Sequence, residues 1–85
     1  MTVTLRKPPD GHNHLGVWVE SDTLARRWRD VYVGNRIVGN IEREDGEWWL
    51  DTDNTAPAGS MANVAVGARL GGELLENVRR AVLGE

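Results

Sequence analysis

The sequence contains no cysteine and no phenylalanine. The absence of cysteine excludes disulfide bonds, thiolate zinc sites and cysteine nucleophiles. The fold must therefore be stabilised by packing, and its aromatic residues are four tryptophans and one tyrosine.

Long hydrophobic runs are also absent, since the longest apolar stretches span only a few residues. The N-terminus has no charged segment followed by an apolar one. Neither a membrane span nor a signal peptide is predicted, no membrane partner is expected, and the expected location is cytoplasmic.

A length of 85 residues predicts a single domain over residues 1–85. A domain of this size buries a smaller share of its surface on folding than a larger domain does, so a second copy would add useful buried area. A homodimer is therefore one expectation.

The net charge of −3 argues against generic binding to nucleic acid, which depends on cations that neutralise phosphates. Residues 1–40 carry six basic and four acidic groups, whereas residues 41–85 carry four basic and nine acidic groups. This asymmetry predicts a dipolar surface, which favours oriented docking on a protein or head-to-tail contact between copies.

Two N-terminal segments have the alternation typical of strands. Residues 2–6 alternate up to Pro8 and Pro9, which predicts a short edge strand. Residues 10–14 have turn chemistry, and residues 15–20 alternate again as a second predicted strand. Residues 21–27 are predicted to form a helical turn.

The middle of the chain predicts a three-stranded meander over residues 29–33, 36–43 and 47–53. Gly34 and Asn35 favour a tight turn between the first two strands, and residues 44–46 favour a second turn. Gly39 predicts a bulge or the close approach of another side chain. One face of the meander is expected to be aliphatic, with Val31, Val33, Ile37, Ile41, Trp48 and Leu50.

The C-terminal segment predicts an amphipathic helix over residues 73–83, which must bury Leu74, Leu75, Val78 and Val82. Residues 54–60 are predicted to be a loop, and residues 61–70 fit either a helix or a strand. The expected fold is α+β: a small antiparallel sheet, made of the meander plus one or two N-terminal strands, packed against a C-terminal amphipathic helix.

Motifs that carry chemistry are scarce. Asp10, His12 and His14 place three ligand types within five residues, but no fourth ligand has fixed spacing, so no metal site is predicted. The sequence has no nucleophile elbow, phosphate-binding loop or dinucleotide fingerprint. We therefore expect a protein that is not an enzyme and that needs no cofactor.

Aromatic placement is the main functional signal. Trp18, Trp28, Tyr32 and Trp49 each fall opposite the aliphatic residues of their strands. If the helix covers the aliphatic side, the other side is an aromatic patch of the kind enriched at binding hot spots. The alternative is that residues 2–20 fold across this face and bury the rings.

Arginines surround these aromatic residues. Arg26, Arg27 and Arg29 flank Trp28, and Arg36 lies on the partner strand of the hairpin. Arginines that alternate with aromatic rings can hold phosphates and stack bases, so a small nucleic-acid-binding module is the alternative to a protein-binding module.

The run from Val31 to Ile41, followed by Asp45, Gly46 and Trp48, resembles the hairpin of small domains from actinobacteria and their phages. In those domains Gly-x-x-(Val/Ile)-Gly-x-Ile precedes Asp-Gly-x-Trp and a C-terminal helix. The resemblance covers residues 29–83 and implies a sheet-plus-helix fold and a phage origin, but it assigns no functional residue. The element order is also similar to the arm-binding domain of phage integrases, whose basic sheet face is missing here apart from Arg26, Arg27, Arg29 and Arg36.

Together these patterns predict a non-enzymatic accessory protein that binds a protein partner through an aromatic sheet face. The expected binding residues are Trp18, Trp28, Tyr32, Trp49, Arg26, Arg27, Arg29 and Arg36.

Overall fold

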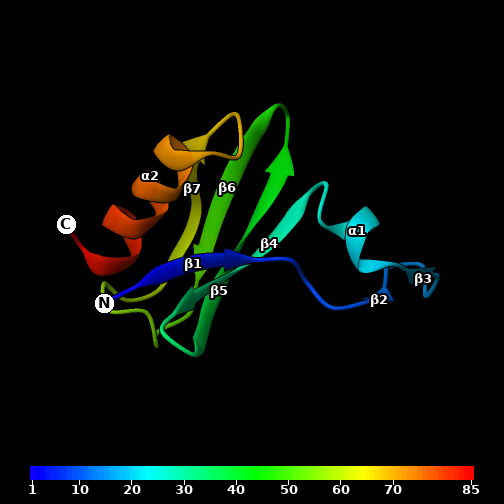
Figure 1. The fold of residues 1–85 in the computed structure, drawn as a ribbon, viewed down its shortest axis with the longest axis horizontal. Helices are drawn as coiled ribbons and strands as arrows, with labels where there is room; N and C mark the ends of the chain where they lie inside the picture. The colour runs from blue at the N-terminus through cyan, green and yellow to red at the C-terminus, as the bar shows by residue number, and fades with distance from the viewer.

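The computed structural model describes residues 1–85 and contains seven strands and two helices. Five strands form an antiparallel sheet in the order β1-β4-β5-β6-β7, and β2 pairs with β3 in a separate two-stranded sheet. Helix α2 packs against the five-stranded sheet (Figure 1), which confirms the predicted α+β fold. The elements are β1 (Val3–Arg6), β2 (Gly11–His12), β3 (Trp18–Val19), α1 (Ser21–Leu24), β4 (Trp28–Val33), β5 (Arg36–Glu44), β6 (Glu47–Thr52), β7 (Met61–Gly67) and α2 (Gly72–Leu83).

The predicted meander is confirmed as β4, β5 and β6. Asp45 and Gly46 both have positive φ, at 52° and 77°, as a tight hairpin turn between twisted strands requires. The predicted edge strand is confirmed as β1, which pairs with β4. The undecided segment contains β7, so Gly67 ends a strand and does not interrupt a helix.

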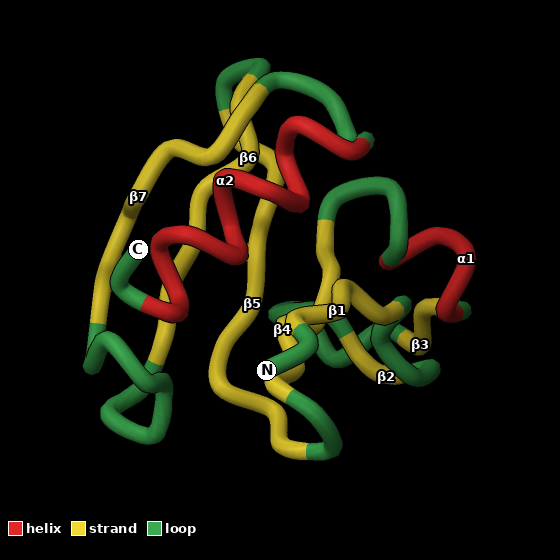
Figure 2. The backbone as a smooth tube through the Cα atoms, turned by 60° about the vertical axis from the view of Figure 1, so that its left-hand side comes forward, coloured by secondary structure: helices red, strands yellow, loops and turns green.

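The core lies between the sheet and α2. Leu74, Val78 and Val82 recur along one face of the helix and are all buried. They meet buried side chains from the sheet, and α2 contacts both edge strands, β7 and β1 (Figure 2). Burial of this apolar surface is the main stabilising contribution to the fold. The sheet contributes Val3, Val31, Val38, Ile41, Trp48, Leu50 and Val66.

Two predicted core positions are wrong. Ile37 is 48% exposed, and Val38 is buried in its place. The cause is a β-bulge, because Val31 pairs with Gly39 while Tyr32 pairs with Ile37, which leaves Val38 as an extra residue in β5. Leu75 is 37% exposed, since the buried stripe of α2 passes through Leu74.

Residues 10–25, here called the extension, project from the end of the sheet and lie away from α2 (Figures 1 and 2). They contain the short β2–β3 hairpin and α1, so the predicted strand over residues 15–20 is confirmed only for Trp18 and Val19. The Asp10 carboxylate accepts a hydrogen bond from the Ser21 N–H at 2.6 Å. Neither helix of the protein is long and apolar enough to cross a membrane.

Acid is expected to weaken α2 through Glu76. Hydrogen bonds from Arg79, at 2.7 and 2.9 Å, lower the pKa of Glu76 from 4.5 to about 2. The ionised form is therefore favoured by folding, and its stabilisation is complete above pH 4.5 and is lost as the pH falls from 4.5 towards 2. Because the pair is exposed to solvent, we expect a small effect.

Thermal midpoints of Glu76→Gln and wild type at pH 6 and at pH 2.5 test this expectation. The variant should lose a little stability at pH 6 and clearly less at pH 2.5, where most of the stabilisation by the ionised carboxylate is already lost. The control is Glu73→Gln, which alters a carboxylate of α2 that takes part in no ion pair. An equal effect of both substitutions would contradict the assignment to the ion pair.

Candidate functional site

The face of the sheet turned away from α2, here called the open face, carries three of the predicted aromatic residues. Strand pairing places Trp28, Glu42 and Trp49 in one row across β4, β5 and β6. Tyr32 lies beside Ile37 farther along β4. Trp28, Tyr32 and Trp49 are each half-buried, and residues 8–14 border Trp28 only along a groove. β1 extends the sheet at its edge, and the extension projects beyond the end of the sheet. The alternative in which residues 2–20 bury these rings is therefore wrong.

The aromatic rings of the open face are held in place by polar contacts. The Trp28 indole N–H donates to the Asp30 carboxylate at 3.0 Å, and the Trp49 indole N–H donates to the Glu44 carbonyl at 2.9 Å. The Arg6 guanidinium lies 4.0 Å from the centre of the Tyr32 ring. With both indole N–H groups satisfied, the two tryptophans offer a fixed apolar surface that costs little entropy to bind.

The open face is acidic as well as aromatic. Asp30, Glu42 and Asp51 lie on it, and Arg6 is the cation beside them. None of these three carboxylates takes part in an ion pair. The face is therefore complementary to a positively charged surface.

A groove of about 390 Å³, here called the side groove, opens where the extension meets the open face. Trp18 lies on the extension, is 57% exposed, and contacts His12 edge to face with ring centres 5.1 Å apart. Exposed Leu15 and Val17 precede it. The side groove thus continues the open face towards the fourth predicted aromatic residue. Its lining is Pro8, His12, Asn13, His14, Leu24, Arg27, Trp28 and Glu42.

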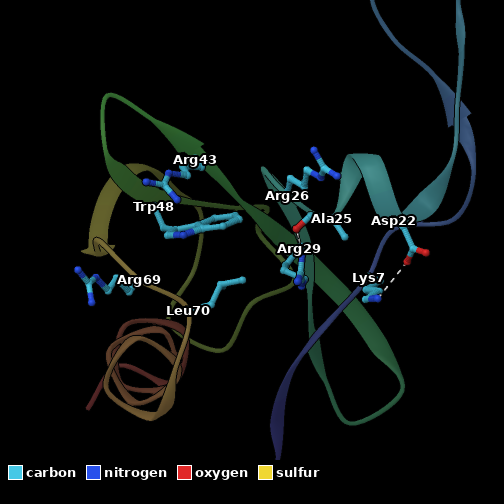
Figure 3. A pocket seen from close by; sticks show the side chains of 9 residues that line it. All are labelled: Lys7, Asp22, Ala25, Arg26, Arg29, Arg43, Trp48, Arg69 and Leu70. Carbon is cyan, nitrogen blue, oxygen red and sulfur yellow. Dashed lines mark hydrogen bonds and ion pairs between the residues drawn. The ribbon is translucent and has the colours of Figure 1, made fainter.

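A second hollow, here called the basic cleft, lies on the other side of the sheet and has a volume of about 570 Å³ (Figure 3). Arg29 and Arg43 alternate with Trp28 and Glu42 along their strands, so they point towards the side that α2 occupies. Trp48 lies between Arg43 and the loop before α2, which carries Arg69 and Leu70. The complete lining is Lys7, Asp22, Ala25, Arg26, Arg29, Arg43, Trp48, Arg69 and Leu70.

The structure separates the predicted arginines from one another. Arg26 and Arg29 line the basic cleft, whereas Arg27 lines the side groove. Arg36 is exposed on the hairpin between β4 and β5 and lines neither hollow. The pKa of Asp53 is lowered mainly by the Thr55 hydroxyl and only in small part by Arg36.

Sequence reasoning missed several residues of both hollows. The position of Glu42 between Trp28 and Trp49 depends on how the strands pair, and the sequence alone does not give that register. The side of the sheet on which Arg43 lies could have been predicted, because Arg43 is two residues after Ile41 and so shares its buried face. No sequence pattern indicates that Lys7 and Arg69 belong to the cleft. Both follow the ends of strands, and only the tertiary fold brings them to it.

No metal centre is formed. The Asp10 carboxylate is engaged with the extension backbone, and His12 packs on Trp18. The structure contains no group of three or more histidine, aspartate or glutamate side chains placed to hold a metal ion.

Comparisons with models of known protein families, with curated proteins and with solved structures found no match.

Proposed function

We propose that this chain is a non-enzymatic binding protein that docks a protein partner on its open face and side groove. The observation that carries the proposal is the row in which Glu42 lies between Trp28 and Trp49 on the sheet face opposite α2, where all three are only half-buried. Exposed apolar residues of the extension, among them Trp18, enlarge the available surface.

The chemistry of the row selects a cationic side chain. An arginine or lysine of the partner would meet the Glu42 carboxylate and the faces of the two flanking indoles, which combines charge pairing with cation–π attraction. The contact of Arg6 with Tyr32 shows that this face already holds one guanidinium against a ring. The partner is therefore a protein segment with an arginine or lysine flanked by apolar residues.

A protein partner fits the open face better than nucleic acid does. Phosphates would meet Asp30, Glu42 and Asp51 on the open face, where Arg6 is the only opposing charge among the paired positions. A nucleic-acid site made of alternating arginines and aromatic rings would also need Arg26 and Arg29 on the same face as Trp28. Both arginines line the basic cleft on the opposite face.

A second copy is a weaker candidate for the same face. A two-fold contact between open faces would bring the same carboxylates of both copies together, and like charges across an interface are unfavourable. We therefore expect this face not to form a dimer, and light scattering on the purified protein to report a monomer.

Selection of displayed peptides on the immobilised protein tests the proposal. We expect the selected peptides to share an arginine or lysine next to apolar residues, and to bind Glu42→Gln about tenfold more weakly than wild type. Trp28→Ala should cause a similar loss. Glu73→Gln on α2 removes the same charge from the opposite side and should leave binding unchanged.

Either of two results would overturn the proposal. Selected peptides could be acidic, or their affinity could be the same for Glu42→Gln as for wild type. Circular dichroism on each variant shows that lost binding does not reflect lost folding.

A further inference from the structure

The basic cleft gathers half of the ten basic residues of a chain whose net charge is negative. They line one hollow together with Trp48, with Arg43 and Arg69 on one side of its ring and Lys7, Arg26 and Arg29 on the other (Figure 3). Asp22 is the only carboxylate in the lining, and its ion pair at 3.1 Å is with Lys7. The five cations are Lys7, Arg26, Arg29, Arg43 and Arg69.

The four arginines of the cleft have no carboxylate partner. The ion pairs of the protein involve Lys7, Arg79 and Arg80 only. Like charges that line one hollow without a counter-ion repel one another, and a bound anion would relieve this repulsion. The cleft is therefore electrostatically prepared for an anion.

One of these guanidinium groups is already oriented. Arg29 Nη1 donates to the carbonyl oxygens of Ala25 and Trp28, the latter at 2.9 Å. These bonds fix the head group in the cleft while Nε and Nη2 make no hydrogen bond to the protein. A donor that is held in place before binding loses little entropy when a ligand arrives.

We propose that the basic cleft binds a small molecule that carries two or more linked phosphate groups, of about the size of a nucleotide. Planar guanidinium groups match phosphate oxygens in bidentate pairs, and four of them exceed what one monoanion can neutralise. A volume of about 570 Å³ lies in the range of small-molecule sites. Leu70, which is 42% exposed, supplies an apolar surface for the part of the ligand that carries no phosphate.

A compact ligand fits the cleft better than a nucleic-acid strand. A strand that leaves the cleft would pass a surface with excess carboxylates, because the whole chain has a net charge of −3. Trp48 is only 1% exposed and cannot stack on a base. The site is independent of the open face, so the failure of one proposal leaves the other intact.

Calorimetric titration with inorganic tripolyphosphate at low salt tests the proposal. We expect saturable binding with one ligand per chain, weakened about tenfold or more in Arg43→Glu and in Arg69→Glu. Both residues are exposed, so the variants should fold, which circular dichroism verifies. Arg36→Glu is the matched control, because it makes the same charge change outside the cleft and should leave the affinity nearly unchanged.

The position of the ligand can be read from the four indole N–H signals in a nitrogen-15 NMR spectrum, assigned by Trp→Phe substitutions. Tripolyphosphate should move the signal of Trp48 and leave those of Trp18, Trp28 and Trp49 in place.

Four results would overturn the proposal: no saturable binding, an equal loss in Arg36→Glu, tighter binding of a single-stranded oligonucleotide, or equally tight binding of an oligoglutamate of matched charge. The last two would identify a nucleic-acid strand or an acidic protein segment as the occupant.

Discussion

Replacing Val78 by aspartate is expected to unfold the protein or to leave it only marginally stable. Val78 has no exposed surface and lies at the centre of the buried stripe of α2. An aspartate there would bury a carboxylate with no cation among its core neighbours, which costs several kcal/mol. A domain of this size has a total stability of about 5–10 kcal/mol, so this one change removes most of it. Circular dichroism during thermal unfolding measures the loss.

Two further variants separate lost packing from introduced charge. Val78→Ala should lower the unfolding free energy by about 2 kcal/mol and keep the fold, because it removes only two methyl groups. Leu75→Asp introduces the same carboxylate three residues earlier, at a position exposed to water. It should be tolerated, whereas a loss as large as that of Val78→Asp would show that α2 buries the face predicted from sequence.

The elements that could be predicted from sequence are those specified by local patterns. Alternation bounded by turn residues was enough for β4, β5 and β6, and helical periodicity with a C-terminal glycine was enough for α2. β7 could not be predicted, because its Ala, Val and Gly residues fit a helix or a strand until the neighbouring β6 is known to pair with it. Tertiary pairing decided the structure of that segment.

The candidate site was predictable only in its aromatic part. Alternation placed Trp28, Tyr32 and Trp49 on one face, and the structure confirms that face. The arginines next to them in sequence were assigned to the same surface, although alternation alone puts Arg29 opposite Trp28. Charge also segregates by the faces of the sheet and not by the halves of the chain, since Arg43 and Arg69 from the acidic half join Lys7 in the basic cleft.

The bulge in β5 is the local feature on which both faces depend. It turns Val38 into the core and places Ile37 beside Tyr32 on the open face. A strand without the extra residue would keep Ile37 on the face of Ile41, as simple alternation predicted. Because one residue of shift exchanges the faces of a strand, the bulge must be held firmly in register.

Gly39→Ala is expected to destabilise the protein by about 3 kcal/mol or more, because Gly39 holds this register through close backbone contact. A Cβ atom at Gly39 would lie 2.0 Å from the Asp51 carbonyl oxygen and 2.8 Å from the Thr52 Cα. Both atoms belong to the backbone of β6, so relief requires two paired strands to separate. Chemical denaturation measures the loss. Gly72→Ala is the matched control, since a Cβ there meets no atom within 4 Å and should be neutral or slightly stabilising. Equal stability of the two variants would show that β5 and β6 are not packed this closely, and that another contact sets the bulge.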